Sequence, residues 1–285
     1  MTLTTTKTVR DYAIETPQTI PVFEKLGIDY CCGGNRPLDE ACAAANLNLE
    51  QVLRQIDAAI AEPARSSDRE LPAGSLAELI AHIVGTHHVF VRKQTPEIEN
   101  LLDKVYAKHG ANHPELAAIR NVFHDLRQEL AMHLMKEENV LFPYIVRMEE
   151  SVLAHEPILP PPFGSVGNPV RMMEHEHDNA GIALRVMRDA SQNFTPPEDA
   201  CTSFRALYTA LENFEKDLHQ HIHLENNVLF PRAVQMETSH QKLPRATSFK
   251  DSVDRLRSAR LVLDRQRPAE TTRQSQLQTE CKSAR

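Results

Sequence analysis

Two histidine–glutamate pairs are the residues whose types and spacing could bind a metal in this chain. His133 and Glu137 lie four residues apart, and His221 and Glu225 repeat that spacing 88 residues later. Residues four apart on a helix share a face, so each pair points an imidazole and a carboxylate the same way. These groups together suit iron, zinc or manganese. Two such pairs in facing helices would repel through their carboxylates, and a shared cation would remove the repulsion.

Both pairs belong to a duplicated phrase. HLMKEENVLFPYIVRME occupies residues 133–149 and HIHLENNVLFPRAVQME residues 221–237, with ten of seventeen positions identical and no gap. The apolar letters predict two equivalent helices, each with its His–Glu pair at or beside the buried stripe. A half-solvated ion pair would explain one copy, but two copies favour a metal site. Pro143 and Pro231 predict a kink or the last turns of each helix.

A metal centre of this kind needs histidines from two further helices. The spacing of apolar residues favours His88 over His82 in one segment and His177 over His175 in another, with His87 left as an alternative to His88. If both glutamates bridge, each of two metals receives two histidine nitrogens and two carboxylate oxygens. An added oxo or hydroxo bridge still leaves a vacant position, which indicates reactivity toward a small ligand.

Other interpretations of the histidines are weaker. HEHD at 175–178 is not the HExxH motif of zinc proteases, because Asn179 stands four residues after His175. The remaining histidines are expected at the surface or in loops: His109, His113, His124, His155, His219, His223 and His240. Of these, His219 and His223 flank His221 in sequence and could instead support that ligand from outside the metal's own ligand set.

Four long amphipathic helices would position the candidate ligands. A capping-box signature at Ser75–Glu78 opens the first, and the second covers about 114–150. The third runs from about 170 to 191, and the fourth follows TPPEDA and ends near 237. We therefore expect an all-α protein whose main domain is a four-helix bundle.

The bundle is expected to be one of three parts. Residues 1–70 predict a small helical domain around CCGGNRP, closed by the breaker-rich linker EPARSSDRELPAGS. Residues 71–240 form the bundle, and residues 241–285 form a basic tail that we expect to be disordered apart from one helical stretch, DSVDRLRSARLVL. The tail carries a net charge of +6 and the rest −13, which argues against a nucleic-acid binder.

The chain carries no membrane or secretion signal that we recognise. Its first residues, MTLTTTKTVRDYAIE, lack an apolar core, and nowhere do eighteen apolar residues run together. We expect a cytoplasmic protein with reduced thiols. The adjacent Cys31 and Cys32 could be lowered-pKa thiolates that bind soft metals or exchange electrons. Cys42, Cys201 and Cys281 are expected to be structural or incidental.

Three stretches resemble the hemerythrin-like di-iron bundles and, more narrowly, the iron-sulfur cluster repair proteins called the repair of iron centres family. They are FEKLGIDYCCGG at 23–34, HLMKEENVLFP at 133–143, and MEHEHDNAG at 173–181 with HIHLENNVLFP at 221–231. The resemblance spans about residues 9–237, and the double-cysteine domain precedes the bundle as it does in that family.

This resemblance implies a non-haem centre of two iron ions, bridged by carboxylates and an oxo or hydroxo group. The implied ligands are His88, His133, Glu137, His177, His221 and Glu225. It also implies a function for Cys31 and Cys32 in redox or metal transfer. The implied role is repair of iron-sulfur clusters damaged by nitric oxide or oxidants, through donation of iron to the damaged proteins. The open alternatives are a nitric oxide reductase and a hemerythrin-like oxygen or redox binder, and a homodimer is also left open.

Overall fold

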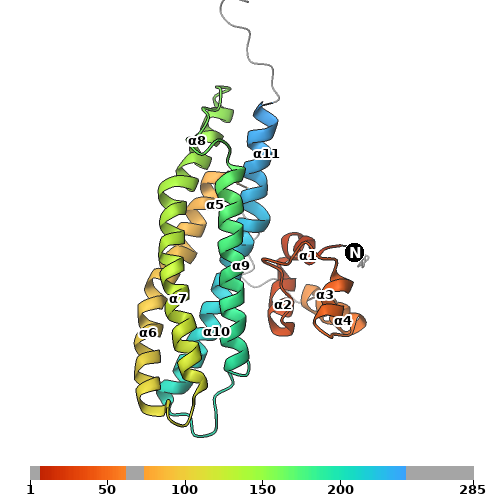
Figure 1. The fold of residues 1–285 in the computed structure, drawn as a ribbon. Coiled ribbons are helices and arrows are strands. Elements are labelled where there is room, and N and C mark those ends of the chain that lie inside the picture. Colours follow the sequence, from red (N-terminus) through yellow and green to blue (C-terminus); the bar gives the residue numbers. More distant parts are fainter. Residues whose placement is uncertain (1–6, 62–73, 242–285) are drawn as a thin grey trace, which may run out of the picture. The chain divides into compact units, whose positions relative to one another are not determined.

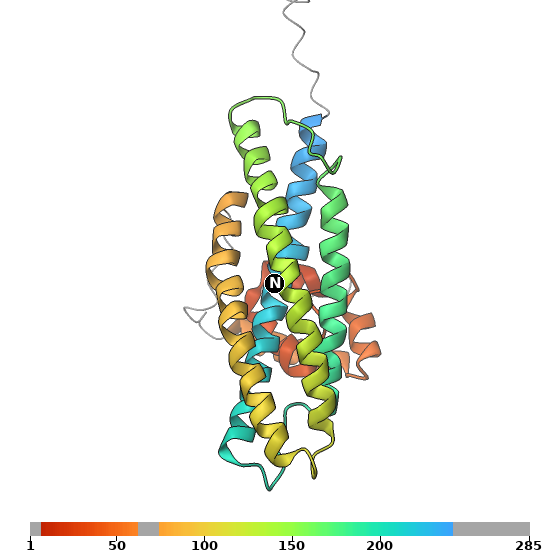
Figure 2. The ribbon, with the colours of Figure 1, turned by 60° about the vertical axis from the view of Figure 1, so that its left-hand side comes forward.

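The structure is a computed structural model that describes residues 7–61 and 74–241, and every named element in these ranges is helical. The predicted linker boundary near residue 70 and the basic tail, including its helical stretch, lie outside the described residues. Figures 1 and 2 show long helices running side by side after residue 74. The expected all-α fold with a four-helix bundle is confirmed. None of the described helices has the length and apolar character needed to cross a membrane.

Each bundle helix begins close to its predicted start. The first consists of α5 (Leu76–Ile83), the π-helical turn η2 (Val84–His88) and α6 (Val89–His109). The second consists of α7 (Glu115–Lys136), the π turn η3 (Glu137–Leu141) and α8 (Phe142–Leu153). The third is the single helix α9 (Gly167–Ala190). The fourth consists of α10 (Thr202–His223), the π turn η4 (Leu224–Leu229) and α11 (Phe230–Gln241). The predicted capping box is present, since Ser75 Oγ accepts from Glu78 N and the Glu78 carboxylate accepts from Ser75 N.

A single residue, Phe142 or Phe230, separates each duplicated proline from the π turn that precedes it. Pro143 is the second residue of α8 and Pro231 the second residue of α11, the 12-residue segments that complete the two bundle helices, so both prolines lie in the last turns as expected. A proline cannot donate a backbone hydrogen bond, and its ring crowds the carbonyl of the preceding turn. A π turn already departs from the regular hydrogen-bond ladder, and such turns occur frequently at functional sites.

Small helices form the N-terminal part, as predicted. They are α1 (Val9–Glu15), the short 3₁₀ helix η1 (Pro17–Thr19), α2 (Ile20–Leu26), α3 (Leu38–Ala44) and α4 (Leu49–Ala61). Gly27 ends α2 with φ +65°, a left-handed conformation that favours glycine. The cysteine loop is tightly wound, because a Cβ on Gly34 would lie 2.5 Å from the backbone oxygen of Tyr30.

The duplicated phrases end on glutamates that cap neighbouring helices. Glu149 is buried, and its carboxylate accepts hydrogen bonds from Leu76 N (2.7 Å) and Ala77 N (2.9 Å) at the start of α5. Glu237 is the equivalent residue of the second copy and accepts from Val166 N (3.0 Å) before α9. The helices that carry His88 and His177 are thereby fixed at their N-termini by the helices that carry the His–Glu pairs.

Replacing Glu149 with alanine should lower the free energy of unfolding by about 2 kcal/mol, because two buried backbone donors at the start of α5 lose a charged acceptor. Urea denaturation of the metal-free protein measures this effect. Glu150→Ala is the matched control, since its exposed side chain should change stability by less than about 0.5 kcal/mol. Equal effects of the two substitutions would show that the cap contributes nothing.

Candidate metal centre

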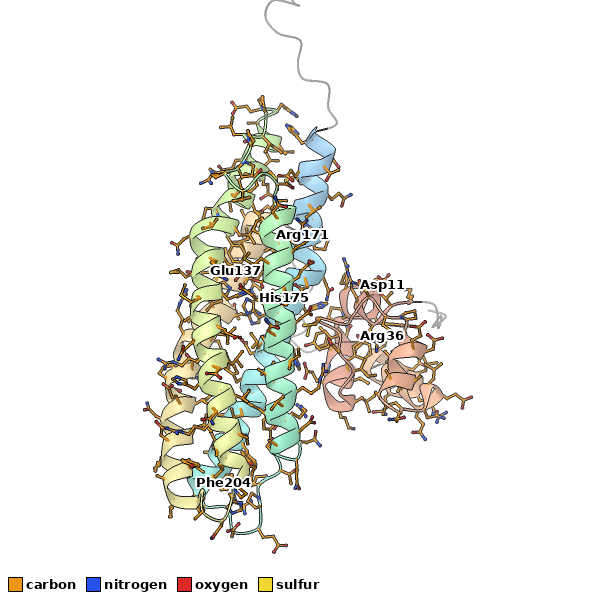
Figure 3. All side chains as sticks on the ribbon, in the orientation of Figure 1. Asp11, Arg36, Glu137, Arg171, His175 and Phe204 are labelled. Carbon is orange, nitrogen blue, oxygen red and sulfur yellow. The ribbon has the colours of Figure 1, made fainter. Side chains whose placement is uncertain are left out.

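The six predicted ligands converge inside the bundle. All six residues are at most 3% exposed, and Figure 3 places Glu137 among the bundle helices. They form two groups that share both glutamates, and within each group the ligand atoms lie within 4.8 Å of one another. Group A contains His88, Glu137, His221 and Glu225, and group B contains His133, Glu137, His177 and Glu225.

A polar layer between two apolar clusters contains these groups. Along the second bundle helix, Glu137 lies between Leu134, which belongs to one buried cluster, and Leu141, which belongs to the other. The fourth helix repeats this order, with Glu225 between Ile222 and Leu229. The apolar packing on either side therefore excludes water from the glutamates and fixes their height in the bundle.

Each glutamate presents one oxygen to each group. Glu137 Oε2 lies 3.5 Å from His88 Nε2, and its Oε1 lies 3.3 Å from His133 Nε2. Glu225 Oε1 lies 3.0 Å from His221 Nε2, while its Oε2 lies 3.1 Å from His177 Nε2. This is the arrangement that two carboxylates need in order to bridge two metal ions.

The histidines of group B aim two ring nitrogens at one point. Nδ1 of His133 contacts the Glu176 carboxylate at 2.9 Å, and Nδ1 of His177 contacts Asn226 Oδ1 at 2.7 Å. These acceptors favour a proton on Nδ1 of each ring, so when both rings are in the neutral form that a metal ligand needs, the two Nε2 lone pairs face each other, 3.0 Å apart. Two nitrogens bound at right angles to one metal at about 2.1 Å lie about 3 Å apart. A cation thus fits between them.

Several buried polar atoms of the centre lack a hydrogen-bond partner among the described residues. They are both oxygens of Glu137, Glu225 Oε2 and His221 Nδ1. Burial and the nearby Glu225 raise the pKa of Glu137. Burial opposes a charge on His133, but the carboxylates of Glu137 and Glu176 raise its pKa to about 10. Two buried carboxylates without enough hydrogen-bond donors are stable only beside a positive charge, and bound metal ions would provide it.

The two groups differ in what supports their histidines. In group A, His88 Nδ1 contacts Glu138 Oε1 at 2.7 Å, and Arg92 donates to the same oxygen. No described residue forms a hydrogen bond with Nδ1 of His221, and its ring stacks on His87 with centroids 5.8 Å apart. Group B instead has one carboxylate and one neutral amide behind its rings. Glu138 and Asn226 occupy matching positions in the two copies, and each contacts Nδ1 of a candidate ligand histidine, but only Glu138 carries a charge.

The rejected histidines lie outside the centre. His82 and His175 are exposed, and His87 contacts Asp217 through Nδ1 at 3.1 Å. His219 contacts Glu24 at 2.9 Å, and His223 contacts the side chain of Asn227, so neither supports a candidate ligand directly. Sequence reasoning missed the supporting roles of Glu138, Glu176 and Asn226, although each is the immediate chain neighbour of a ligand.

The double-cysteine loop lies beside group B. Asp29 Oδ1 accepts from the backbone N–H groups of Cys31 (3.1 Å) and Cys32 (2.9 Å), and the two sulfurs are 3.7 Å apart. The hydrogen bond with Cys32, burial and nearby acids raise the pKa of Cys31 well above its usual value. The predicted lowered pKa is wrong for Cys31. With Asp29 the two thiols still form a third set of potential metal ligands.

The other described cysteines have different surroundings. Cys42 is buried in the apolar core. Cys201 precedes α10, where the backbone N–H groups of Phe204 and Ser203 lower its pKa, and its sulfur lies 3.2 Å from His109 Nε2. Cys281 lies outside the described residues.

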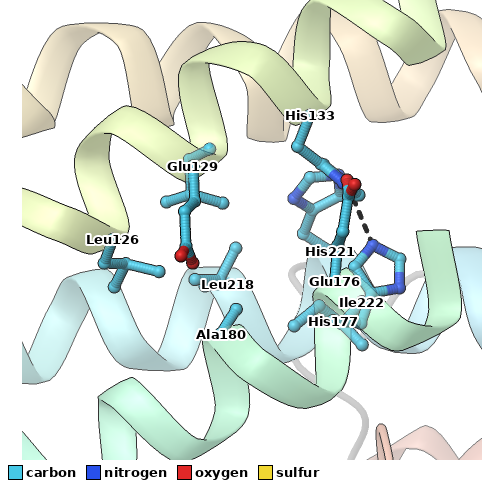
Figure 4. A pocket seen from close by; sticks show the side chains of 10 residues that line it. Leu126, Glu129, His133, Glu176, His177, Ala180, Leu218, His221 and Ile222 are labelled. Carbon is cyan, nitrogen blue, oxygen red and sulfur yellow. Dashed lines mark hydrogen bonds and ion pairs between the residues drawn. The ribbon is translucent and has the colours of Figure 1, made fainter. Parts of the chain in front are cut away.

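A narrow pocket reaches group B from between α7, α9 and α10. Figure 4 shows it, with Glu129 and Glu176 among its polar side chains. His133 and His177 line this pocket, which has room for about one water-sized molecule. Its lining is Leu126, Glu129, Leu130, His133, Glu176, His177, Ala180, Leu218, His221 and Ile222.

Fold and centre together define a cation-binding bundle of the hemerythrin class. The model of the Hemerythrin HHE cation binding domain matches residues 79–233, and that of a domain of unknown function, DUF542, matches residues 5–60. The chain is also similar to proteins named iron-sulfur cluster repair protein YtfE. The relative from Pectobacterium carotovorum is 36% identical over 80% of this chain and 96% of its own length, and that from Yersinia pseudotuberculosis is 37% identical over 79% and 95%. The chain belongs to this hemerythrin-type family of iron-sulfur cluster repair proteins, which confirms the resemblance stated above.

Proposed function

We propose that this chain holds two iron ions in groups A and B and donates iron to iron-sulfur clusters damaged by nitric oxide or oxidants. One observation carries the proposal: two buried carboxylates each present one oxygen to both histidine pairs. The names of the relatives support the repair role rather than the alternatives of nitric oxide reduction or oxygen binding. When bound, iron supplies a labile, redox-active cation.

The charge, burial and orientation of the candidate ligands suit the binding of iron. Glu137 and Glu225 provide the negative charge, and their complete burial keeps water away from it. His88 and His133 are each held by a carboxylate at Nδ1, which orients the Nε2 lone pair toward the metal position. The supporting carboxylates Glu138 and Glu176 are only partly buried, so the centre lies close to the surface of the bundle on these sides.

A cytoplasmic location and the partners found there are part of the same proposal. Iron donation requires ferrous iron and reduced thiols, which the cytoplasm provides. The four described cysteines are all free, as such a compartment would leave them. The partners would be proteins whose clusters have lost iron, with nitric oxide or dioxygen as small ligands at the pocket.

The test is transfer of iron to an acceptor. Anaerobically iron-loaded protein should reactivate a dehydratase whose [4Fe–4S] cluster has lost one iron, in the presence of a chelator that removes free iron. His133→Ala should lower the reactivation rate at least about 10-fold, because group B loses one of its ligands. His124→Ala is the matched control, since His124 lies on the same helix but its side chain is exposed. Equal rates for both variants, or no reactivation by the loaded protein, would refute the proposal.

A further inference from the structure

The π turn of the second copy binds the cysteine loop through two asparagines. Asn226 Nδ2 donates to the carbonyl oxygen of Cys31 at 3.4 Å, and Asn227 Nδ2 donates to that of Tyr30 at 3.0 Å. In the first copy, the counterpart of Asn227 is the exposed Asn139, whose amide bonds its own helix at the Met135 carbonyl. The two copies therefore diverge where the loop contacts the bundle.

Asn226 contacts the loop and a metal-ligand candidate at the same time. Its Oδ1 accepts from His177 Nδ1 at 2.7 Å, while its Nδ2 contacts Cys31. A side-chain amide offers both an acceptor and a donor on one planar group; a carboxylate at this position could accept from His177 but would repel the Cys31 carbonyl. At the equivalent position, Glu138 meets two donors, His88 and Arg92, and a carboxylate suits it.

The carbonyl that Asn226 contacts lies between the two residues that carry the thiols. It belongs to the peptide that joins Cys31 to Cys32, and the Cys32 sulfur also donates to the carbonyl oxygen of His177 at 3.6 Å. A ligand that binds both sulfurs closes a ring containing this peptide. Ring closure fixes the side-chain torsions on both sides of this peptide, and a shift of its carbonyl would break the 3.4 Å contact with Asn226.

We propose that Asn226 is a positioning residue that couples the Cys31–Cys32 loop to the metal position of group B, so that ligation of the two thiols loosens that one ion. The proposal rests on the two-metal centre of the proposed function. Group A is outside this coupling, because its supporting residues Glu138 and Arg92 belong to the first two bundle helices. Partners behind a metal-bound histidine typically change metal affinity by about 10–100-fold.

The coupling can be tested with Co²⁺ as the metal and phenylarsine oxide as the dithiol ligand. The reagent forms two As–S bonds and releases one water, so no oxidant is needed. In wild-type full-length protein it should speed the transfer of one of two Co²⁺ ions to EDTA by roughly 10-fold. Asn226→Ala should speed release of the same ion without the reagent and abolish the response to it. Cys31→Ser/Cys32→Ser should also abolish the response.

Asn226→Asp separates the two contacts. The new carboxylate still accepts from His177 but cannot donate to Cys31, so both ions should be held at least as firmly as in wild type while phenylarsine oxide has no effect. Asn139→Ala, at the exposed position of the first copy, should behave as wild type. If wild type binds two ions and Asn226→Ala changes neither release rate, or both equally, the coupling is refuted and the proposed function stands. Fewer than two ions in wild type would refute both.

Discussion

Glu137→Gln is expected to abolish binding of both metal ions, whereas His88→Ala should remove only one. Glu137 contributes an oxygen to both groups, and a neutral amide offers one weaker acceptor where two charged oxygens are needed. His88 belongs to group A alone. The measurement is metal content per chain after anaerobic loading with ferrous iron and removal of unbound metal. Retention of both ions by Glu137→Gln would exclude the bridging role.

The same substitution should stabilise the metal-free protein. Burial and Glu225 raise the pKa of Glu137, so its ionisation at neutral pH costs free energy in the folded state. Removal of the charge should therefore raise the free energy of unfolding of the metal-free protein. Urea denaturation in the presence of a chelator measures this. Glu150→Gln, an exposed control on the same bundle helix, should alter neither metal content nor stability. Opposite effects on metal binding and stability would be hard to explain for a purely structural glutamate.

The ligand groups were predictable from sequence because they obey helical periodicity. The buried stripe separates His88 from His82 and His177 from His175, but His87 is buried as well, and the family resemblance was needed to favour His88 over it. The pairs His133–Glu137 and His221–Glu225 keep their spacing because four residues bring two side chains onto one face. Local rules of this kind need no knowledge of the tertiary structure.

The supporting residues could not be derived in this way. Glu176 and Asn226 act on rings from other helices, so their roles depend on how the helices are rotated against one another. Glu149 reads as a polar residue near a helix end, yet it caps a helix that begins 73 positions earlier in the chain. The π turns were also missed, because a single extra residue in one turn leaves the apolar pattern nearly intact. For Asn226 and Glu149 the repeat offered a signal, namely a polar residue exchanged or kept at matching positions, whereas Glu176 lies outside the duplicated phrase.

Arg188→Ala is expected to destabilise the metal-free protein by about 3–5 kcal/mol, the cost of leaving a buried charge without its partner. Glu215 on α10 is only 2% exposed, and Arg188 Nε on α9 donates to its two oxygens at 2.9 and 3.0 Å. The arginine also lies over the Phe194 ring, 5.2 Å from its centroid. Loss of the guanidinium therefore removes both the charge partner of Glu215 and packing on Phe194 in the loop between α9 and α10. Urea denaturation measures the effect, and Arg185→Ala, an exposed arginine one turn earlier, is the matched control.

The double variant Arg188→Met/Glu215→Leu decides whether the pair serves stability or position. Apolar residues of similar size remove both buried charges together, so most of the stability lost in Arg188→Ala should return. The pair joins the helices that carry His177 and His221, one from each metal group. If it fixes their rotation, the double variant should fold well but bind the two ions with lower affinity. Wild-type affinity in a stable double variant would show that apolar packing alone sets the geometry of the centre.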